Sequence, residues 1–193
     1  MTKDPIKQFA QWLGEAKKNP SIAEPTAACL ATATKDAFPS ARMVLLKEFD
    51  ERGFVFYTNL KSRKGDEIIQ NPNVAMCFYW MPLERQVRIE GRVEQVSDEQ
   101  ADAYFATRPR DSRIGAWVSR QSQPLKGRND LLQAISETMA RFDGGDVPRP
   151  PFWSGFRVVT NKIEFWQQGD FRLHERELFM RNGDSWAISA LYP

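Results

Sequence analysis

Histidine and cysteine are both scarce in this chain of 193 residues, which carries one histidine, His174, and two cysteines, Cys29 and Cys77. So few imidazole and thiol groups leave little material for a zinc site, and no Cys-x-x-Cys pair occurs. A serine–histidine–aspartate triad would have to use His174, whose neighbours Arg172 and Arg176 disfavour the imidazolium that a triad forms. Both cysteines lie in apolar runs, so we expect buried and reduced thiols.

Glycine-rich nucleotide motifs and long apolar runs are also missing. No Gly-x-Gly-x-x-Gly, P-loop or Gly-x-Ser-x-Gly pattern occurs. No apolar run approaches the roughly 18 residues of a membrane-spanning helix, and the N-terminus lacks an apolar signal core, so we expect a cytoplasmic protein without membrane contact. The net charge of +2 is too small to indicate nucleic-acid binding, so any anion site must be a local cluster.

The pattern of apolar residues predicts a mainly β, antiparallel fold with peripheral helices, in a single domain over residues 1–193. Strand-like runs follow one another at hairpin spacing rather than alternating with helices, which is typical of an antiparallel sheet or barrel. We expect strands over 40–49, 53–59, 73–80, 85–96, 156–159, 162–167, 171–180 and 186–191. We expect helices over 4–18, 62–71, 98–107, 110–119 and 128–142.

Three local signals make these predictions specific. Asp4 can cap the first helix and Pro5 suits its first turn. Ser97 and Gln100 are spaced as a capping box for the helix that follows them. Gly91 interrupts a cleanly alternating strand, which indicates a β-bulge.

The only histidine lies between two arginines at a spacing of two residues. If this segment is a strand, Arg172, His174 and Arg176 share one face. Three such groups repel one another unless an anion lies over them. A solvated edge strand, whose charges prevent aggregation, explains the pattern equally well, so the spacing leaves both interpretations open.

Other cationic clusters combine with hydroxyl and amide groups. Arg63 and Lys64 lie at an expected helix start, where main-chain N–H groups suit a phosphate. Tyr104, Arg108 and Ser112 have the spacing of one helical face and could form a phosphate cradle.

Gln121 and Ser122 offer further hydrogen-bond donors, an amide and a hydroxyl. Arg42 and Lys47 are five residues apart, so on a strand their side chains should face opposite sides. Each cluster alone could be a solvated surface, but together they favour one or two phosphorylated ligands. Trp166 could be a core residue or a wall against a flat ring.

The longest motifs resemble those of the pyridoxamine/pyridoxine 5′-phosphate oxidase family, in order and over nearly the whole chain. They are R-M-V-L-L-K (42–47), F-Y-T-N-L-K-S-R-K (56–64), L-E-R-Q-V-R-I-E-G (83–91), Y-F-A-T-R-P-R-D-S-R-I-G-A-W-V-S-R-Q-S (104–122), P-P-F-W-S-G-F-R-V (150–158), I-E-F-W-Q (163–167) and R-L-H-E-R (172–176).

The resemblance implies an FMN-binding split β-barrel and a homodimer with FMN at the subunit interface. It implies oxidation of pyridoxine or pyridoxamine 5′-phosphate to pyridoxal 5′-phosphate, with O2 as acceptor and H2O2 released. Family members commonly have an N-terminal segment that folds over the substrate. This chain begins just before its first helix, so we expect a more open site.

The resemblance also assigns roles to residues. FMN contacts would be Arg42, Met43, Val44, Leu45, Leu46, Lys47, Tyr57, Thr58, Arg63, Lys64, Gln86, Gln121, Ser122, Trp166 and Arg176. Substrate contacts would be Lys47, Tyr104, Arg108, Ser112, Arg172, Leu173 and His174, with Arg172 and His174 at the reacting ring.

Two alternatives remain. A phenazine-pathway flavin oxidase shares the fold implied here, but the match at Tyr104, Arg108, Ser112, Arg172 and His174 favours the vitamin substrate. A non-catalytic protein that binds FMN or pyridoxal phosphate belongs to a different class, and a turnover assay separates it from an enzyme.

Overall fold

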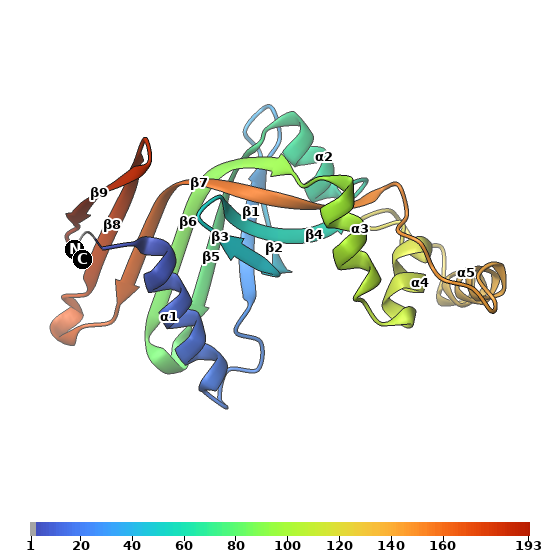
Figure 1. The fold of residues 1–193 in the computed structure, drawn as a ribbon, viewed down its shortest axis with the longest axis horizontal. Helices are drawn as coiled ribbons and strands as arrows, with labels where there is room; N and C mark the ends of the chain where they lie inside the picture. Colours follow the sequence, from blue (N-terminus) through green and yellow to red (C-terminus); the bar gives the residue numbers. More distant parts are fainter. Residues whose placement is uncertain (1–2) are drawn as a thin grey trace.

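An antiparallel sheet dominates the computed structural model, which describes residues 3–193 (Figure 1). The first two residues, where the chain begins ahead of its first helix, lie outside this range. Among the described residues the sheet has nine strands, seven of them in the order β2-β1-β5-β6-β7-β4-β3, with β8 paired to β7 and β9 to β8. The strands are β1 (Ala27–Ala33), β2 (Pro39–Leu45), β3 (Glu48–Asp50), β4 (Gly53–Asn59), β5 (Asn73–Trp80), β6 (Arg85–Gln95), β7 (Trp153–Gln167), β8 (Glu175–Asn182) and β9 (Ser185–Ala190).

The connection between β2 and β3 shows why the sheet curves. These strands lie at opposite ends of the seven-strand order, yet only residues 46 and 47 separate them in sequence. The Leu46 N–H donates to the Thr26 carbonyl, and the next N–H, of Lys47, donates to the Val55 carbonyl. The sheet therefore bends until its two edges approach, which gives the half-barrel. The expected continuous strand over 40–49 is wrong, because the chain changes partner here.

Strand β7 is long enough to pair with strands in both halves of the molecule. Its first part pairs with β4 over residues 153–158, and its last part pairs with β8 over residues 162–167. We expected two strands here, but a bulge keeps the strand continuous: Gly91 pairs with Thr160 and Glu90 with Lys162, so Asn161 is the extra residue. A Cβ on Gly91 would lie 2.2 Å from the Val159 carbonyl oxygen, which explains the glycine.

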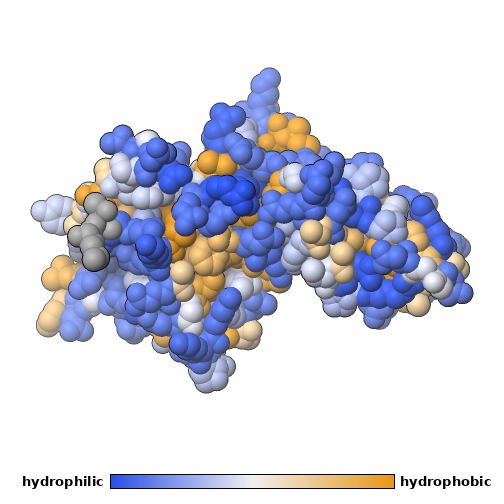
Figure 2. Space-filling view, viewed as in Figure 1, coloured by the Kyte–Doolittle hydropathy of each residue, from blue (hydrophilic) through white to orange (hydrophobic). Residues whose placement is uncertain are grey.

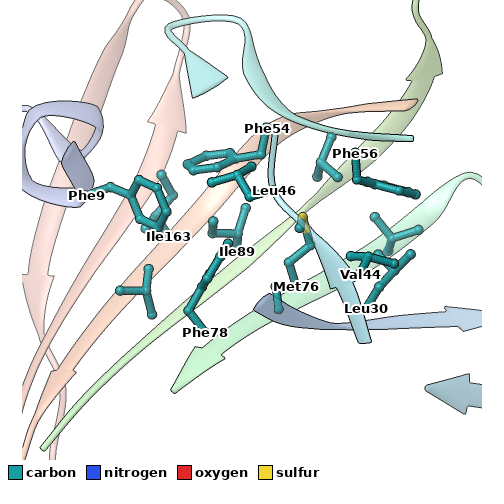
Figure 3. Close-up of a cluster of buried hydrophobic side chains, with 14 of the residues drawn as sticks. Phe9, Leu30, Val44, Leu46, Phe54, Phe56, Met76, Phe78, Ile89 and Ile163 are labelled. Carbon is teal, nitrogen blue, oxygen red and sulfur yellow. The ribbon is translucent and has the colours of Figure 1, made fainter. Parts of the chain in front are cut away.

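The core lies between the curved sheet and helix α1 (Pro5–Lys18), whose Asp4 cap accepts from the Ile6 N–H at 2.9 Å. Phe9 is fully buried and packs edge-on against Phe54 and Phe78, with ring centroids 4.9 and 5.1 Å apart. Figure 3 shows Phe9 reaching from α1 toward side chains on several strands. The apolar face of this helix therefore anchors it to the barrel.

The remaining helices are α2 (Arg63–Gln70), α3 (Asp98–Ala106), α4 (Arg110–Val118) and α5 (Arg128–Arg141). Helices α3, α4 and α5 lie toward the end of the molecule opposite β8 and β9, whereas α2 lies nearer the middle, beside β1 (Figure 1). The predicted helix and its Ser97 cap are confirmed, since the Ser97 hydroxyl accepts from the Gln100 N–H at 3.2 Å. The reciprocal half of the capping box does not form, because the Gln100 side chain donates to Glu48 Oε2 at 2.7 Å. No residue of α5 is buried, so its apolar positions do not join the core.

The segment around the histidine is not the strand that we expected over 171–180. A 3-10 turn spans Asp170–Arg172, and β8 begins only at Glu175. Phe171 and Arg172 both have positive φ, 55° and 64°, a conformation incompatible with a strand. The argument that Arg172, His174 and Arg176 share one strand face is therefore wrong.

The outer face of the sheet, away from the core, is only partly polar. Cys29 and Cys77 are direct partners on β1 and β5 and are half-buried on this face, not buried as we expected. Met43, Leu45 and Tyr79 are exposed. On the side of the molecule where α1 lies in front, Figure 2 shows an apolar area between the two ends of the molecule. Within residues 3–193, no helix is long and apolar enough to cross a membrane.

Candidate active site

A cavity of about 700 Å³ lies where β2 and β4 meet helices α2, α3 and α4. It collects side chains from segments far apart in the sequence, because the curved sheet brings β2 beside β4. Many of the residues predicted for the flavin and the substrate phosphate line it together. The lining residues are Met43, Val44, Leu45, Lys47, Tyr57, Thr58, Asn59, Lys64, Tyr104, Arg108, Pro109, Ser112, Gly115, Ala116, Ser119, Gln121 and Trp153.

Lys64 is a buried cation in the first turn of α2. Its ammonium lies 2.9 Å from Gln121 Oε1, 3.1 Å from Thr58 Oγ1 and 3.3 Å from Ser62 Oγ, all neutral acceptors. No carboxylate within the described chain pairs with it. Burial, with a smaller contribution from the charge of Arg42, lowers the pKa of Lys64 to about 8. An anion in the cavity would relieve this cost.

Arg108 is a second cation that has no carboxylate partner among the described residues. Its guanidinium lies over the rings of Trp153 and Phe105, 4.8 and 5.3 Å from their centroids. Its Nη1 is buried and has no hydrogen-bond partner in the described chain, and burial lowers the pKa of the side chain. A buried guanidinium N–H without an acceptor is rare, so this atom indicates a place for a ligand oxygen.

Tyr104, Arg108 and Ser112, which we predicted on one face of a single helix, come together from two helices and the turn between them. Tyr104 belongs to α3 and Ser112 to α4, because Pro109 ends the first helical run and α4 begins at Arg110. The prediction of one continuous helical face is therefore wrong. The turn between the two helices nevertheless keeps Tyr104, Arg108 and Ser112 on the same cavity wall.

Parallel aromatic rings form another wall of the cavity. Tyr57 lies beside both Tyr104 and Trp153, with ring centroids 4.0 and 5.3 Å away, and the centroids of those two rings are 6.2 Å apart. The Tyr57 hydroxyl donates to Glu48 Oε1 at 3.0 Å, and burial together with this carboxylate raises the pKa of Tyr57. Sequence reasoning missed Trp153 and Asn59, which are register partners on β7 and β4. No local signal could have found them, because strands about 100 residues apart create the pairing.

A second group of predicted residues lies on the outer face of the sheet. Gln86, Trp166 and Arg176 are successive partners across β6, β7 and β8, so they form one row. Arg176 is held by the buried Glu164, whose Oε1 accepts from Nε at 2.9 Å, and by the Tyr192 carbonyl oxygen at 2.9 Å. Neither this row nor residues 172–174 line the 700 Å³ cavity.

His174 extends this outer row, which we call the C-terminal group: Gln86, Trp166, Arg172, Leu173, His174 and Arg176. The His174 ring lies 4.7 Å from the Trp166 ring, and a hollow of about 400 Å³ beside it is also lined by Arg176. Arg172 and Leu173 are exposed. In Figure 1, β8 lies at the opposite end of the molecule from α3 and α4.

A few of the predicted flavin residues lie neither in the 700 Å³ cavity nor in the C-terminal group. The Arg42 guanidinium turns to the buried Glu67, with Nη2 at 3.1 Å from Oε2, and Arg63 Nε binds the other oxygen of Glu67 at 2.9 Å. Leu46 is a core residue. Ser122 lines an adjoining hollow with Gln121.

The donor set of the cavity fits a phosphorylated flavin and a phosphorylated substrate. Within the described chain the buried Lys64 and the partly buried Arg108 have no carboxylate partner, and hydroxyl, amide and aromatic groups surround them. The curved antiparallel sheet with this cationic cavity defines a half-barrel protein whose cavity holds the donors that a phosphorylated small molecule needs.

Comparison with known proteins agrees with this interpretation of the fold and the cavity. The model of the pyridoxamine 5′-phosphate oxidase family matches residues 15–140, and that of the pyridoxine 5′-phosphate oxidase C-terminal dimerisation region matches residues 153–193. The chain belongs to the pyridoxamine 5′-phosphate oxidase family.

Several relatives support this assignment. The chain is 54% identical to a pyridoxine/pyridoxamine 5′-phosphate oxidase of Zymomonas mobilis, with 100% of both chains covered. It is 56% identical to one of Rubrobacter xylanophilus, covering 98% of this chain and 87% of that one. The crystal structure of PhzG from Burkholderia lata, in complex with tetrahydrophenazine-1-carboxylic acid, has a TM-score of 0.92 and 32% identity, covering 98% and 93%. An FMN-binding protein of Nostoc punctiforme shares the fold, with a TM-score of 0.78 at 18% identity.

Proposed function

We propose that this protein oxidises pyridoxine 5′-phosphate and pyridoxamine 5′-phosphate to pyridoxal 5′-phosphate with O2, releasing H2O2 and, from the amine, ammonia. The observation that carries the proposal is a pair of cations, the buried Lys64 and the partly buried Arg108, which line one cavity and pair with no carboxylate among the described residues. Relatives at 54–56% identity bear the name of this activity, whereas the phenazine-pathway structure is 32% identical.

Different residues of the cavity bind the two ligands, the flavin and the substrate. We assign the flavin to β2 and β4, with Lys64 and Gln121 at its phosphate, and the substrate phosphate to Lys47, Tyr104, Arg108 and Ser112. When bound, FMN supplies the hydride acceptor, which O2 regenerates. The protein's part is to bind both phosphates and to orient the substrate carbon.

The separation of the two groups of residues supports a shared site. A single chain keeps the C-terminal group on the outer face, apart from the cavity. In a homodimer, the C-terminal group of one protomer can complete the cavity of its partner. The match of residues 153–193 to a dimerisation region and the exposed Met43, Leu45 and Tyr79 support this arrangement.

Arg172 has a distinct role in this scheme. Its guanidinium is exposed in the isolated chain and pairs with no carboxylate among the described residues. We assign it to the substrate ring, where its charge stabilises negative charge that develops near the reacting carbon.

Aerobic turnover of pyridoxine 5′-phosphate by the FMN-loaded protein tests the proposal. Pyridoxal 5′-phosphate and peroxide should appear in equal amounts. Bound flavin without product would refute the oxidase activity and would favour a binding protein or an oxidase of another substrate.

A further inference from the structure

The loop that carries Arg172 and His174 is a tight turn with an internal hydrogen bond. Gly169 and Leu173 approach so closely that a Cβ on Gly169 would lie 2.3 Å from the Leu173 carbonyl oxygen. The Leu173 N–H donates to the Asp170 carbonyl at 2.9 Å. Phe171 and Arg172 both have positive φ, 55° and 64°, which strains the backbone of a residue with a side chain. Such a conformation persists only where its surroundings hold it.

This loop also determines how the imidazole can be protonated. The Gly169 main-chain N–H donates to Nδ1 of His174 at 3.3 Å. Because Nδ1 accepts this bond, it carries no proton, and the neutral ring must carry its proton on Nε2. Within residues 3–193, Nε2 forms no hydrogen bond of its own.

We propose that Gly169 is a positioning residue that fixes the tautomer of His174, so that His174 serves the reaction as a neutral hydrogen-bond donor through Nε2 and not as a general base. The acceptor is an electron-rich oxygen or nitrogen substituent of the substrate ring. This inference rests on the proposed function, since it places His174 at the substrate.

The same surroundings argue against a base. With its proton already on Nε2, a base would have to take the second proton on Nδ1, which would break the bond from Gly169. A neutral donor keeps this bond. The tilted ring of Trp166 fixes the plane of the imidazole from one side.

Nitrogen-15 NMR of protein labelled at histidine tests the tautomer directly, since the chain has one histidine and the spectrum is unambiguous. At a pH where the ring is neutral, the FMN-loaded wild-type protein should show the proton on Nε2 alone. A proton on Nδ1, or an even mixture, would overturn the proposal whether or not the enzyme turns over.

Gly169→Ala should convert the single tautomer into a mixture, because the new Cβ displaces the Leu173 carbonyl and with it the loop. Gly14→Ala is the matched control, since nothing lies within 4 Å of the added Cβ, and it should leave the signal unchanged. If Gly169→Ala keeps the pure wild-type tautomer, the positioning role of Gly169 is refuted.

Two substitutions of the histidine distinguish a donor from a base. His174→Gln keeps a neutral N–H donor near the position of Nε2, and kcat should fall about tenfold or less. His174→Phe removes the donor, and kcat should fall further, with flavin content equal in both. If His174→Gln loses as much as His174→Phe, about 10²- to 10⁴-fold, a general base is indicated and the donor role is wrong.

Discussion

Replacing the buried lysine of the cavity should affect the empty and the FMN-loaded protein in opposite directions. Lys64→Met removes a cation whose neighbours are all neutral acceptors, so the apoprotein should become more stable at pH 7. The pKa of Lys64 is lowered from 10.5 to about 8, and one pH unit corresponds to about 1.4 kcal/mol, so the gain is at most about 3 kcal/mol.

The same change should weaken FMN binding. A hydrogen bond to a charged group is worth about 1.5–3 kcal/mol, which predicts a Kd for FMN about 10- to 150-fold higher. Quenching of flavin fluorescence on titration measures this Kd, and thermal unfolding of the apoprotein measures the stability change. Lys61→Met is a matched control, since Lys61 is exposed and three residues away, and it should change both values little.

The lysine also gives a pH dependence with a definite sign. Its folded pKa, about 8, lies below its unfolded pKa near 10.5, so the unfolded apoprotein binds more protons between these values. Apoprotein stability contributed by Lys64 should therefore rise from pH 8 to 10.5, while FMN affinity falls. Unchanged FMN affinity in Lys64→Met, together with a lower melting temperature, would refute the phosphate-binding role.

Three further changes test other parts of the account. Arg172→Ala should lower turnover far more than FMN content, because the guanidinium acts on the substrate; equal losses of both would contradict that role. Glu67→Gln should destabilise the fold by about 3 kcal/mol in urea unfolding, because Arg42 and Arg63 lose their shared carboxylate; wild-type stability would show that the cluster is dispensable. In the wild-type protein the pKa of Glu67 is lowered to about 2, so the stability that this carboxylate contributes is lost as pH falls from about 4.5 through 2. Acid unfolding measures this loss of stability. Gly91→Ala should destabilise the protein by a few kcal/mol, because the new Cβ meets the Val159 carbonyl at the bulge; a neutral result would mean that the strands adjust freely.

Local patterns predicted most of the elements correctly. Helix α1 was predictable because Asp4 caps it and its apolar residues recur at helical spacing. The Gly91 bulge was predictable because only glycine allows the close approach to β7. The strand expected around His174 was wrong, because the alternation of Arg172 and His174 imitates a strand while positive φ at Phe171 and Arg172 prevents one.

The site was only partly predictable. Lys64 was found because a basic residue at an expected helix start is a local feature. The wall formed by Trp153 depends on pairing between β4 and β7, which no local pattern encodes. The turn at Pro109 changed how Tyr104 and Ser112 meet without separating them. The single-domain organisation and the individual contacts to FMN and substrate stay predictions.

Subunit complementation tests most directly the central claim, that two chains share one active site. Arg108→Ala disables the cavity, and Arg172→Ala disables the C-terminal group. The two variants, carrying different tags, are co-expressed, and heterodimers are isolated through both tags. One of the two sites in each heterodimer should be intact, so turnover should return to about half of the wild-type value, although each parent is nearly inactive. Turnover no higher than that of the parents would show that each site lies within one chain.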